Sequence, residues 1–544
     1  MEGFYGVMHG LAIAAQPMHM LYTLIGVFIG TMISHLPGIG PSAGIALLIP
    51  VTFGMDPTTA LMMLIGIYYG CMYGGAVTAI LLNTPGDAAA VMTVLDGYPL
   101  ARAGRAAATL AIAATSSFIA GMIGVTALSF IALPLASVAL KFGPTEYFGL
   151  IFFALSTVSA LNGESIGKGM MAVFLGLAIG TVGIDLQSGV PRFTMGLTQL
   201  QDRVSFLVVV VGLFAIAEVS RMVEGHLGGH MPAVKVKGRI MFTRKEFGLA
   251  WPAALRGTAI GFFCGAAPGL GGTIAAMLSY IFEKKISKTP ERFGKGAIEG
   301  VAAPEAATNA DSCGAFVHLL ALGVPGSGAT AVIMGAFIMY GIQPGPMLFH
   351  TQPDLVWGLI ASMYIGNIML LVLNMPLVGL LAKILYVPTG VLICVILGIA
   401  SAGVYSFHSD PFDLYLALGF GLLGFAFRKL GIPKAPLLFG LILGHTLEQS
   451  FRQAMTISRG DATVFLRSPI AAGLLACSVL MFAASVWRKR RPSRTLQEAE
   501  RRIKGEDDSP EAMLTIPPDS VPAEASRDAA AKAFARPVPA SHRP

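Results

Sequence analysis

The chain has 544 residues, of which 54% are hydrophobic and only 12% are charged, and its mean hydropathy is +0.70. Because soluble domains carry roughly 25% charged residues, this composition excludes an ordinary soluble enzyme or binding module. Several apolar runs exceed the ~20 residues that cross a bilayer as a helix, so we predict an all-α polytopic membrane protein with about 10–12 transmembrane segments. The net charge of +7 does not indicate nucleic-acid binding, because the basic residues gather in short loops and in one tail.

Four Pro-Gly breaks interrupt the apolar runs. The first break (residues 37–41) and the third break (268–272) lie in matching places of the two halves of the chain. Each is followed by another, the second break at residues 85–87 and the fourth at residues 325–328. Proline costs roughly 3 kcal/mol in a helix interior, and paired interruptions of apolar segments indicate a transporter with inverted repeats. We therefore predict two inverted repeats with re-entrant or broken helices; for any single break, a simple kink or a tight packing point is the alternative.

Hydropathy and charge divide the chain into four parts. A first membrane repeat covers residues 1–222, a basic cytoplasmic linker 223–250, and a second repeat with further C-terminal helices 251–487. Residues 488–544 are charged and rich in Pro and Ala, so we expect a disordered cytoplasmic tail. Further candidate membrane segments lie, in chain order, near residues 107–133, 148–161, 170–184, 206–217, 355–385, 391–402, 414–427, 436–447 and 469–487.

Basic residues orient the chain, because cytoplasmic loops are enriched in Lys and Arg. This rule places the linker (Lys235, Lys237, Arg239, Arg244 and Lys245), residues 284–295 and the C-terminus in the cytoplasm. The apolar stretch 251–282 is then flanked by cytoplasmic loops on both sides. Roughly 30 helical residues at ~1.5 Å each span ~45 Å, which is too long for one straight crossing and too short for two. We predict a re-entrant hairpin with the third break at its tip inside the membrane; a single kinked helix is the alternative.

The breaks have a chemistry of their own. A half-helix that starts after a break presents unpaired N–H groups that suit an anion such as a carboxylate. A half-helix that ends before a break presents unpaired carbonyls that suit Na⁺ or another hard cation. We predict that all four breaks surround one solute, with small polar side chains beside them. The predicted substrate-binding residues are Pro37, Gly38, Gly40, Ser42, Asn83, Thr84, Pro85, Gly86, Pro268, Gly269, Gly271, Thr273, Pro325, Gly326 and Ser327.

Ionisable residues in membrane segments are functional candidates by default. Those in or near the apolar stretches are Asp96, Glu164, Asp185, Glu218, Glu299, Glu305, Asp311, His318 and Glu448. The predicted cation-binding residues are Asn83, Asp87, Glu305 and Asn309. Helix capping or packing is the alternative role for the acids, and His318 is expected to be a core histidine. No metal is expected other than a transported Na⁺, and no cofactor; the five scattered cysteines have no C-x-x-C pair.

Two long motifs carry a family resemblance. Residues 73–86, reading YGGAVTAILLNTPG, continue to Leu-Asp-Gly-Tyr-Pro at 95–99, and residues 293–309 read FGKGAIEGVAAPEAATN ahead of Gly-Val-Pro-Gly-Ser at 323–327. They resemble the large membrane subunit of the tripartite tricarboxylate transporters, and the resemblance covers nearly everything up to about residue 487. Relatives often have a small residue such as Ala where this chain has Gly272. Asp87 stands where Thr or Glu are familiar, and as an anion beside the site it would repel a carboxylate, so a cation or proton role is at least as plausible.

The resemblance implies a multi-pass permease of the bacterial inner membrane that imports carboxylates such as citrate by alternating access, driven by a Na⁺ or H⁺ gradient. Its implied partners are a small membrane subunit of about four helices and a periplasmic solute-binding protein, besides the solute and membrane lipids. A carboxylate permease or channel that works without a binding protein is the alternative. The chain lacks the P-loop motif G-x-x-x-x-G-K-[ST] and the zinc-protease motif H-E-x-x-H, so we do not expect an enzyme.

Overall fold

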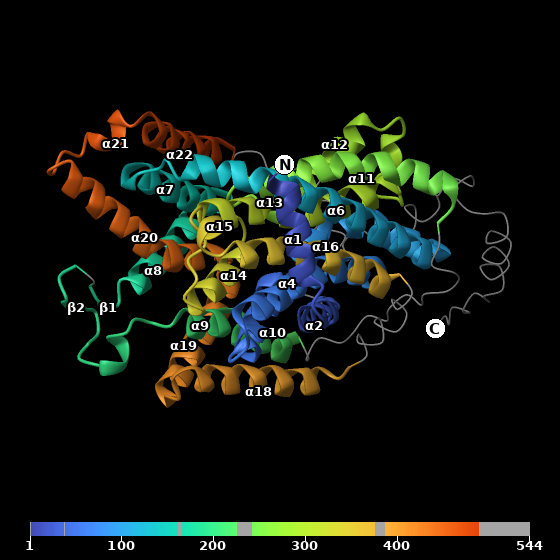
Figure 1. The fold of residues 1–544 in the computed structure, drawn as a ribbon. Coiled ribbons are helices and arrows are strands. Elements are labelled where there is room, and N and C mark those ends of the chain that lie inside the picture. The colour runs from blue at the N-terminus through green and yellow to red at the C-terminus, as the bar shows by residue number, and fades with distance from the viewer. Residues whose placement is uncertain are drawn as a thin grey trace, which may run out of the picture.

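The computed structural model describes residues 2–36, 39–161, 165–185, 187–225, 242–375 and 387–488. These residues are almost entirely helical, apart from the two-residue antiparallel strands β1 (Gly183–Ile184) and β2 (Pro191–Arg192), which project from one end of the molecule (Figure 1). Within the described residues, 8 helices or continuous helical runs are long and apolar enough to cross a membrane, and shorter apolar helices accompany them. The prediction of an all-α polytopic membrane protein is confirmed.

The first half of the chain begins with a short helix that leads into two helices on either side of the first break. Its helices are α1 (Glu2–Ala14), α2 (Pro17–Ser34), α3 (Pro41–Leu48), α4 (Pro57–Leu82), α5 (Val91–Leu100), α6 (Ala106–Ala139), α7 (Pro144–Leu161), α8 (Ile166–Gly180), α9 (Phe206–Val210) and α10 (Ala217–Gly225). Short 3₁₀ or π turns join several of them, namely η1 (Ile49–Thr52), η2 (Ala88–Ala90), η3 (Ala101–Arg105), η4 (Thr198–Leu200) and η5 (Val211–Ile216).

The second half repeats the broken pattern and then adds C-terminal helices. Its helices are α11 (Arg244–Gly265), α12 (Gly271–Ile286), α13 (Glu299–Leu322), α14 (Gly328–Met339), α15 (Leu348–Thr351), α16 (Pro353–Asn374), α18 (Thr389–His408), α19 (Pro411–Lys429), α20 (Ala435–Ile457), α21 (Val464–Arg467) and α22 (Pro469–Arg488), with the 3₁₀ turn η6 (Pro290–Arg292) before α13.

These helices agree with the expected segments, with two differences. The segment expected near 170–184 ends at Gly180, because Gly183 and Ile184 form strand β1 instead. The segment expected near 355–385 is described up to Met375, and the rest of it lies outside the described residues. Most of the basic linker and nearly all of the predicted tail also lie outside them.

Helices α4 and α13 form the centre of the molecule. The most apolar stretch of α4 is 94% buried, and α13 is buried along nearly its whole length. Local sequence fixes where α4 begins, because Pro57 occupies its first turn and the Asp56 carboxylate accepts the N–H of Thr59 at 3.1 Å. Burial of both faces explains why neither helix shows an apolar stripe in its sequence.

Glycines let two pairs of helices touch backbone to backbone. On α2, a β carbon placed on Gly26 would lie 2.2 Å from the carbonyl oxygen of Met63, and one on Gly30 would lie 2.3 Å from that of Ile67. Both positions increase together along α2 and α4, so the two helices run parallel. Any side chain larger than hydrogen would force them apart, which is the small-residue packing typical of membrane helices.

The same contact recurs between α11 and α13. A β carbon on Gly257 would lie 2.3 Å from the carbonyl oxygen of Ala303, and one on Gly261 would lie 2.1 Å from that of Ala307. Because α11 and α13 are parallel, the intervening helix α12 must carry the chain back to the side where α11 began. Residues 251–282 therefore form a helical hairpin, as predicted, and the alternative of one kinked helix is wrong.

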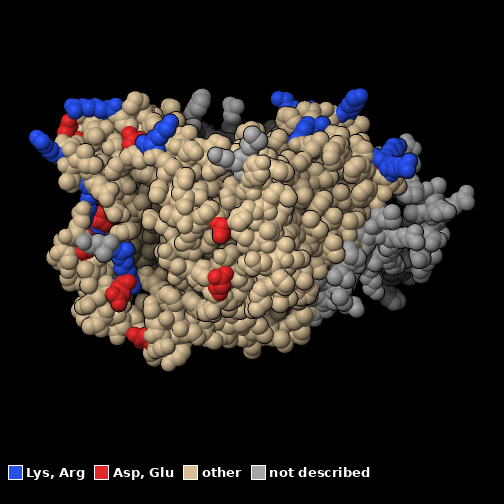
Figure 2. Space-filling model, in the orientation of Figure 1, with Lys and Arg blue, Asp and Glu red and all other residues tan. Residues whose placement is uncertain are grey.

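Charged side chains are scarce over the middle of the molecule. In the view of Figure 2, a broad face carries few charged residues, and the Lys and Arg side chains lie mostly along its upper edge, with a few at its left side. The ion pair between Arg105 and Glu246 joins the start of α6 to the start of α11, and Asp96 holds the loop that follows η6. Within the described residues, the start of α11 and the loop after η6, both predicted to be cytoplasmic, thus lie beside the same α5–α6 junction.

Candidate functional site

Each described break separates two helices. The first break lies between α2 and α3, the second between α4 and η2, the third between α11 and α12, and the fourth between α13 and α14. Pro37 and Gly38 of the first break lie outside the described residues. Four helices therefore end at the breaks, and three α-helices and the 3₁₀ turn η2 begin there.

The second and fourth breaks have the same backbone geometry. Helix α4 is followed by Asn83 in the left-handed conformation (φ 57°, ψ 21°), and α13 is followed by Gly323 in the same conformation (φ 68°, ψ 28°). Four residues later, Asp87 and Ser327 are both extended and both cap the next helix, accepting the N–H of Ala90 at 3.0 Å and of Thr330 at 3.2 Å. Sequences that share only Pro-Gly thus fold into matching turns in the two halves.

The four breaks meet in a closed ring. The third and fourth are joined directly, because the N–H of Gly269 donates to the carbonyl oxygen of Gly326 at 2.9 Å. A β carbon placed on Gly328 would lie 3.1 Å from Ser42 Oγ, which brings the fourth break against the first. We call residues 39–42, 83–89, 266–273 and 323–328 the break ring.

The remaining two contacts close the break ring. A β carbon on Gly40 would lie 3.5 Å from Cβ of Asp87, which joins the first break to the second. A β carbon on Gly272 would lie 3.3 Å from Cβ of Ala89, which joins the second break to the third. Residues up to 289 positions apart in sequence (39 and 328) therefore surround one place, where the N-terminal N–H groups of α3, α12 and α14 can face an anion.

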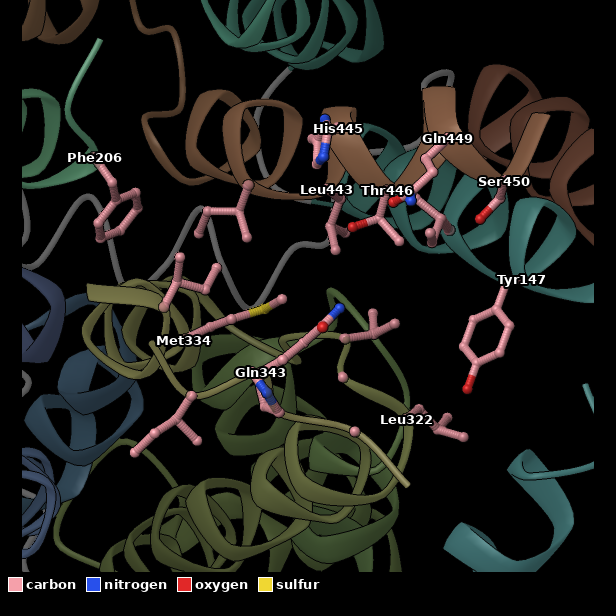
Figure 3. A pocket seen from close by; sticks show the side chains of 18 of the residues that line it. Tyr147, Phe206, Leu322, Met334, Gln343, Leu443, His445, Thr446, Gln449 and Ser450 are labelled. Carbon is pink, nitrogen blue, oxygen red and sulfur yellow. The ribbon is translucent and has the colours of Figure 1, made fainter. Parts of the chain in front are cut away.

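A large cavity reaches the break ring from one side. Its volume is about 960 Å³, and it is lined by Gly323 and Val324 of the fourth break together with parts of α7, α14 and α20. Figure 3 shows Gln343, His445, Thr446 and Gln449 among the polar side chains on its wall. Arg203 also lines this cavity. Sequence reasoning missed these residues, because they lie in several segments with no shared motif.

Ion pairs hold the β1–β2 hairpin against the helix that lines this cavity. Arg192 donates to Glu448 on α20 at 2.8 Å, and Arg452 on α20 donates to Asp185 at 3.1 Å. The backbone N–H of Gln187 together with Arg452 lowers the pKa of Asp185 to about 2. Asp185 and Glu448, noted as ionisable candidates, thus act in fixing the hairpin beside the cavity.

The sequence as a whole places this architecture among known transporters. The chain matches the Tripartite tricarboxylate transporter TctA family over residues 20–439. The chain belongs to this family. It is 45% identical over 485 residues, 88% of this chain and 96% of the relative, to an Agrobacterium vitis protein described as an uncharacterized 52.8 kDa protein in the TAR-I ttuC' 3' region. It is 48% identical over 234 residues, 42% of this chain and 97% of the relative, to an uncharacterized protein in the TAR-II ttuC' 3' region of the same organism. No solved structure matches the chain.

The small polar residues predicted for the site of this TctA-family protein all lie in the break ring where they are described, but their hydroxyl groups are engaged differently. Ser42 lies at the contact between the first and fourth breaks, and Ser327 forms a reciprocal cap with Thr330. Thr84 donates to the carbonyl oxygen of Leu82 at 3.3 Å, so its hydroxyl serves the end of α4. Thr273, at the start of α12, is exposed in the isolated chain.

The predicted cation-binding residues have protein partners to different degrees. Asp87 caps η2, and Glu305 accepts a hydrogen bond from Thr93 of α5. Asn309 donates to the carbonyl oxygen of Glu305 at 3.0 Å, while its own Oδ1 is buried and hydrogen-bonds to none of the described residues. Asn83 turns the chain at the end of α4.

One acid that was noted only as ionisable differs from these in having no partner. The side chain of Asp311 on α13 is 0% exposed, and both of its carboxylate oxygens are buried with no hydrogen-bond partner among the described residues. It lies beside the third break, because a β carbon placed on Gly272 would be 3.5 Å from Asp311 Oδ2. From sequence alone, Asp311 is as good a candidate for a functional role as Asp96 or Glu305. The three acids differ in the hydrogen-bond partners that packing places beside them, which the sequence does not reveal.

Proposed function

We propose that this TctA-family subunit imports carboxylates, with a tricarboxylate such as citrate as the probe of first choice, and that the break ring is where the solute binds. One observation carries the proposal: four breaks from distant parts of the chain close on one another through contacts between each neighbouring pair. Isolated kinks would have no reason to converge. Half-helix ends that converge at depth are the usual construction of a transporter's binding site.

The backbone supplies the recognition in this proposal. Helices α3, α12 and α14 begin in the ring. The N–H groups of their first turns have no preceding turn of the same helix whose carbonyl oxygens could accept them. Their dipoles favour negative charge. Ser42 adds a hydroxyl at the contact between the first and fourth breaks. The solute's carboxylates are bound in this way without an arginine in the ring.

In this proposal, transport uses the cavity and the two repeats. The cavity of about 960 Å³ gives a solute access to the fourth break from one side. Alternating access then requires that access pass to the other side, as one group of helices moves against the rest. We propose that a cation gradient drives this cycle, and that a periplasmic solute-binding protein and a small membrane subunit complete the system.

Gly40→Ala tests the location of the site. Gly40 has φ −78° and ψ 175°, which alanine adopts without strain, and its added methyl group would meet only Cβ of Asp87, at the ordinary distance of 3.5 Å. The variant should therefore fold normally while placing a methyl group at the start of α3 in the ring. We expect the KM for labelled citrate, measured in vesicles containing the complete transporter, to rise about tenfold or more, which corresponds to about 1.4 kcal/mol of lost binding.

The matched control is Gly398→Ala on α18, where an added β carbon meets nothing within 4 Å. Its KM should equal that of the unmodified protein, and its thermal stability should be equal or slightly higher because alanine favours the helix. An unchanged KM in Gly40→Ala, with uptake intact, would place the solute elsewhere. The same vesicles separate the alternative function: uptake that proceeds fully without the periplasmic protein indicates a permease or channel that works alone.

A further inference from the structure

Asp311 poses an electrostatic problem that the described protein does not solve. Its side chain is 0% exposed, and neither carboxylate oxygen has a hydrogen-bond partner among the described residues. None of the ion pairs found among those residues includes it. A buried carboxylate with neither donors nor a counter-charge does not persist as an anion; it takes up a proton or binds a cation.

Other buried acids among the described residues each have an ion-pair or hydrogen-bond partner. Glu283, 2% exposed, pairs with Arg256 through two bonds of 2.5 and 3.0 Å. Asp96, 0% exposed, accepts three backbone N–H groups and the hydroxyl of Tyr280. Glu305, 2% exposed, accepts a hydrogen bond from Thr93. The protein therefore supplies each of these three acids with at least one partner, and leaves Asp311 without one.

The surroundings of Asp311 place it at the third break. A β carbon on Gly265, the last residue of α11, would lie 2.1 Å from the backbone oxygen of Asp311, and one on Gly272, at the start of α12, would lie 3.5 Å from its Oδ2. The ionisable groups that face it from other elements are Tyr68 of α4 and Cys264 of α11, with Cys313 on its own helix. The neighbouring contact from α12 is a glycine, and none of these groups is a base that could neutralise the carboxylate.

We propose that Asp311 binds the monovalent cation whose gradient drives transport, and that its neutralisation admits the solute's carboxylate to the break ring. This inference rests on the proposed function and names the residue that couples the two ions. A single carboxylate balances one positive charge, and no group of three or more His, Cys, Asp or Glu able to hold a metal ion occurs among the described residues, which disfavours a divalent ion. H⁺ and Na⁺ each carry the single positive charge that neutralises one carboxylate.

The coupling is electrostatic. An ionised Asp311 beside the start of α12 repels an anion bound at the same break, and this repulsion is strong where water is excluded. Binding of the cation removes it, so cation and solute each raise the affinity for the other by the same factor. The solute then binds well only when the cation is already bound, which ties carboxylate uptake to the cation gradient.

The test uses the purified full chain in detergent and needs no solute. Thermal unfolding is measured in NaCl and in choline chloride at equal ionic strength, from pH 5 to pH 9, for the unmodified protein and for Asp311→Asn. Asparagine matches the shape of the aspartate and has no charge to neutralise. We expect it to abolish a cation-dependent rise in Tm, and to leave Tm in choline chloride at high pH equal to or above that of the unmodified protein.

The NaCl and pH series show which of the two ions, Na⁺ or H⁺, binds at Asp311. A Tm raised by NaCl at pH 8 in the unmodified protein and not in Asp311→Asn supports Na⁺ as the bound ion. A Tm that falls with rising pH in choline chloride only when Asp311 is present supports H⁺. Both proteins responding alike to NaCl and to pH would overturn the proposal.

Two further variants serve as controls, one at another buried titratable residue and one at a buried acid that has hydrogen-bond donors. His318 lies seven residues beyond Asp311 on α13, and both of its ring nitrogens are buried without a hydrogen-bond partner among the described residues. A pH dependence that His318→Gln removes and Asp311→Asn keeps would assign the titration to the histidine and overturn the proposal. Asp96→Ala, which leaves three backbone N–H groups without their acceptor, should lower Tm in every buffer. If citrate uptake fails in complete vesicles while the Asp311-dependent cation shift is present, the proposed solute is wrong and the cation site stands.

Discussion

Buried carboxylates differ in this protein by what surrounds them. Asp96 lies on α5, and its two oxygens accept the N–H groups of Gly294, Gly296 and Ala297 at 2.7–2.8 Å and the hydroxyl of Tyr280 at 2.8 Å. A carboxylate that accepts several donors is well solvated by protein. It therefore ties α5 to the loop before α13, and its role is structural.

Asp96→Ala should be strongly destabilising. The change strands three buried backbone N–H groups, and each unsatisfied donor costs about 1–3 kcal/mol. We expect a loss of at least about 3 kcal/mol in the free energy of unfolding, measured by thermal or denaturant unfolding of the purified chain in detergent. Asp354→Asn, at an exposed position paired with His9, is the control and should change stability by no more than about 0.5 kcal/mol. Equal stability of the two variants would show that the loop does not depend on Asp96.

Helix pairs in the core depend on glycine at one face. On α11, Gly257 and Gly261 allow the backbone of α13 to approach, and on α2, Gly26 and Gly30 do the same for α4. The four-residue spacing keeps both glycines of a pair on one side of the helix. This packing fixes the position of α2 along α4 and of α11 along α13.

Substitution of Gly261 tests this packing within a single helix. In Gly261→Ala the added methyl group would lie 2.1 Å from the carbonyl oxygen of Ala307, so α11 must move away from α13. We expect about 1–3 kcal/mol of destabilisation from this overpacking. Gly248→Ala on the same helix meets nothing within 4 Å and should be neutral or gain up to about 1 kcal/mol from helix propensity. Unfolding measurements that rank the two variants the other way would contradict the parallel contact.

At the scale of the whole molecule, the two halves run in opposite directions past each other. On α4 and α13, Tyr69 Oη lies 2.9 Å from Cys313 Sγ, and further along α4 Ala76 lines one small cavity together with Glu305, so position rises on one helix as it falls on the other. The repeated turns at the second and fourth breaks match in backbone angles. Both observations support the predicted inversion of the repeats.

Cysteine labelling tests the inversion in cells. Single cysteines replace Gln16, just before α2, and Lys245, at the start of α11, in a chain whose native cysteines are replaced. If the repeats are inverted, a membrane-impermeant maleimide should label Gln16→Cys in intact cells and Lys245→Cys only after permeabilisation, because we predict that the basic loop is cytoplasmic. Both sites must label in permeabilised membranes as a control. Labelling of both from the same side would disprove inverted repeats.

Sequence determined much of this protein because the relevant forces are local. Composition fixes the membrane class, since apolar length and the scarcity of charge are properties of the chain itself. The breaks are equally legible, because Pro and Gly disfavour a helix wherever they stand. The length and flanking charges of residues 251–282 were enough to predict a hairpin, and the long motifs around residues 73–99 and 293–327 were enough to indicate the family.

Only the tertiary structure decided which of these features act together. Gly40, Asp87, Gly272 and Gly328 are brought into one ring by contacts between residues far apart in the chain, and no local rule sets such contacts. The cavity wall is assembled from separate segments for the same reason. Asp311 and Asp96 are the same residue type in similar apolar surroundings of sequence, yet one has four donors and the other none. The free energy of a buried charge depends on the groups that packing places beside it, and that placement belongs to the fold.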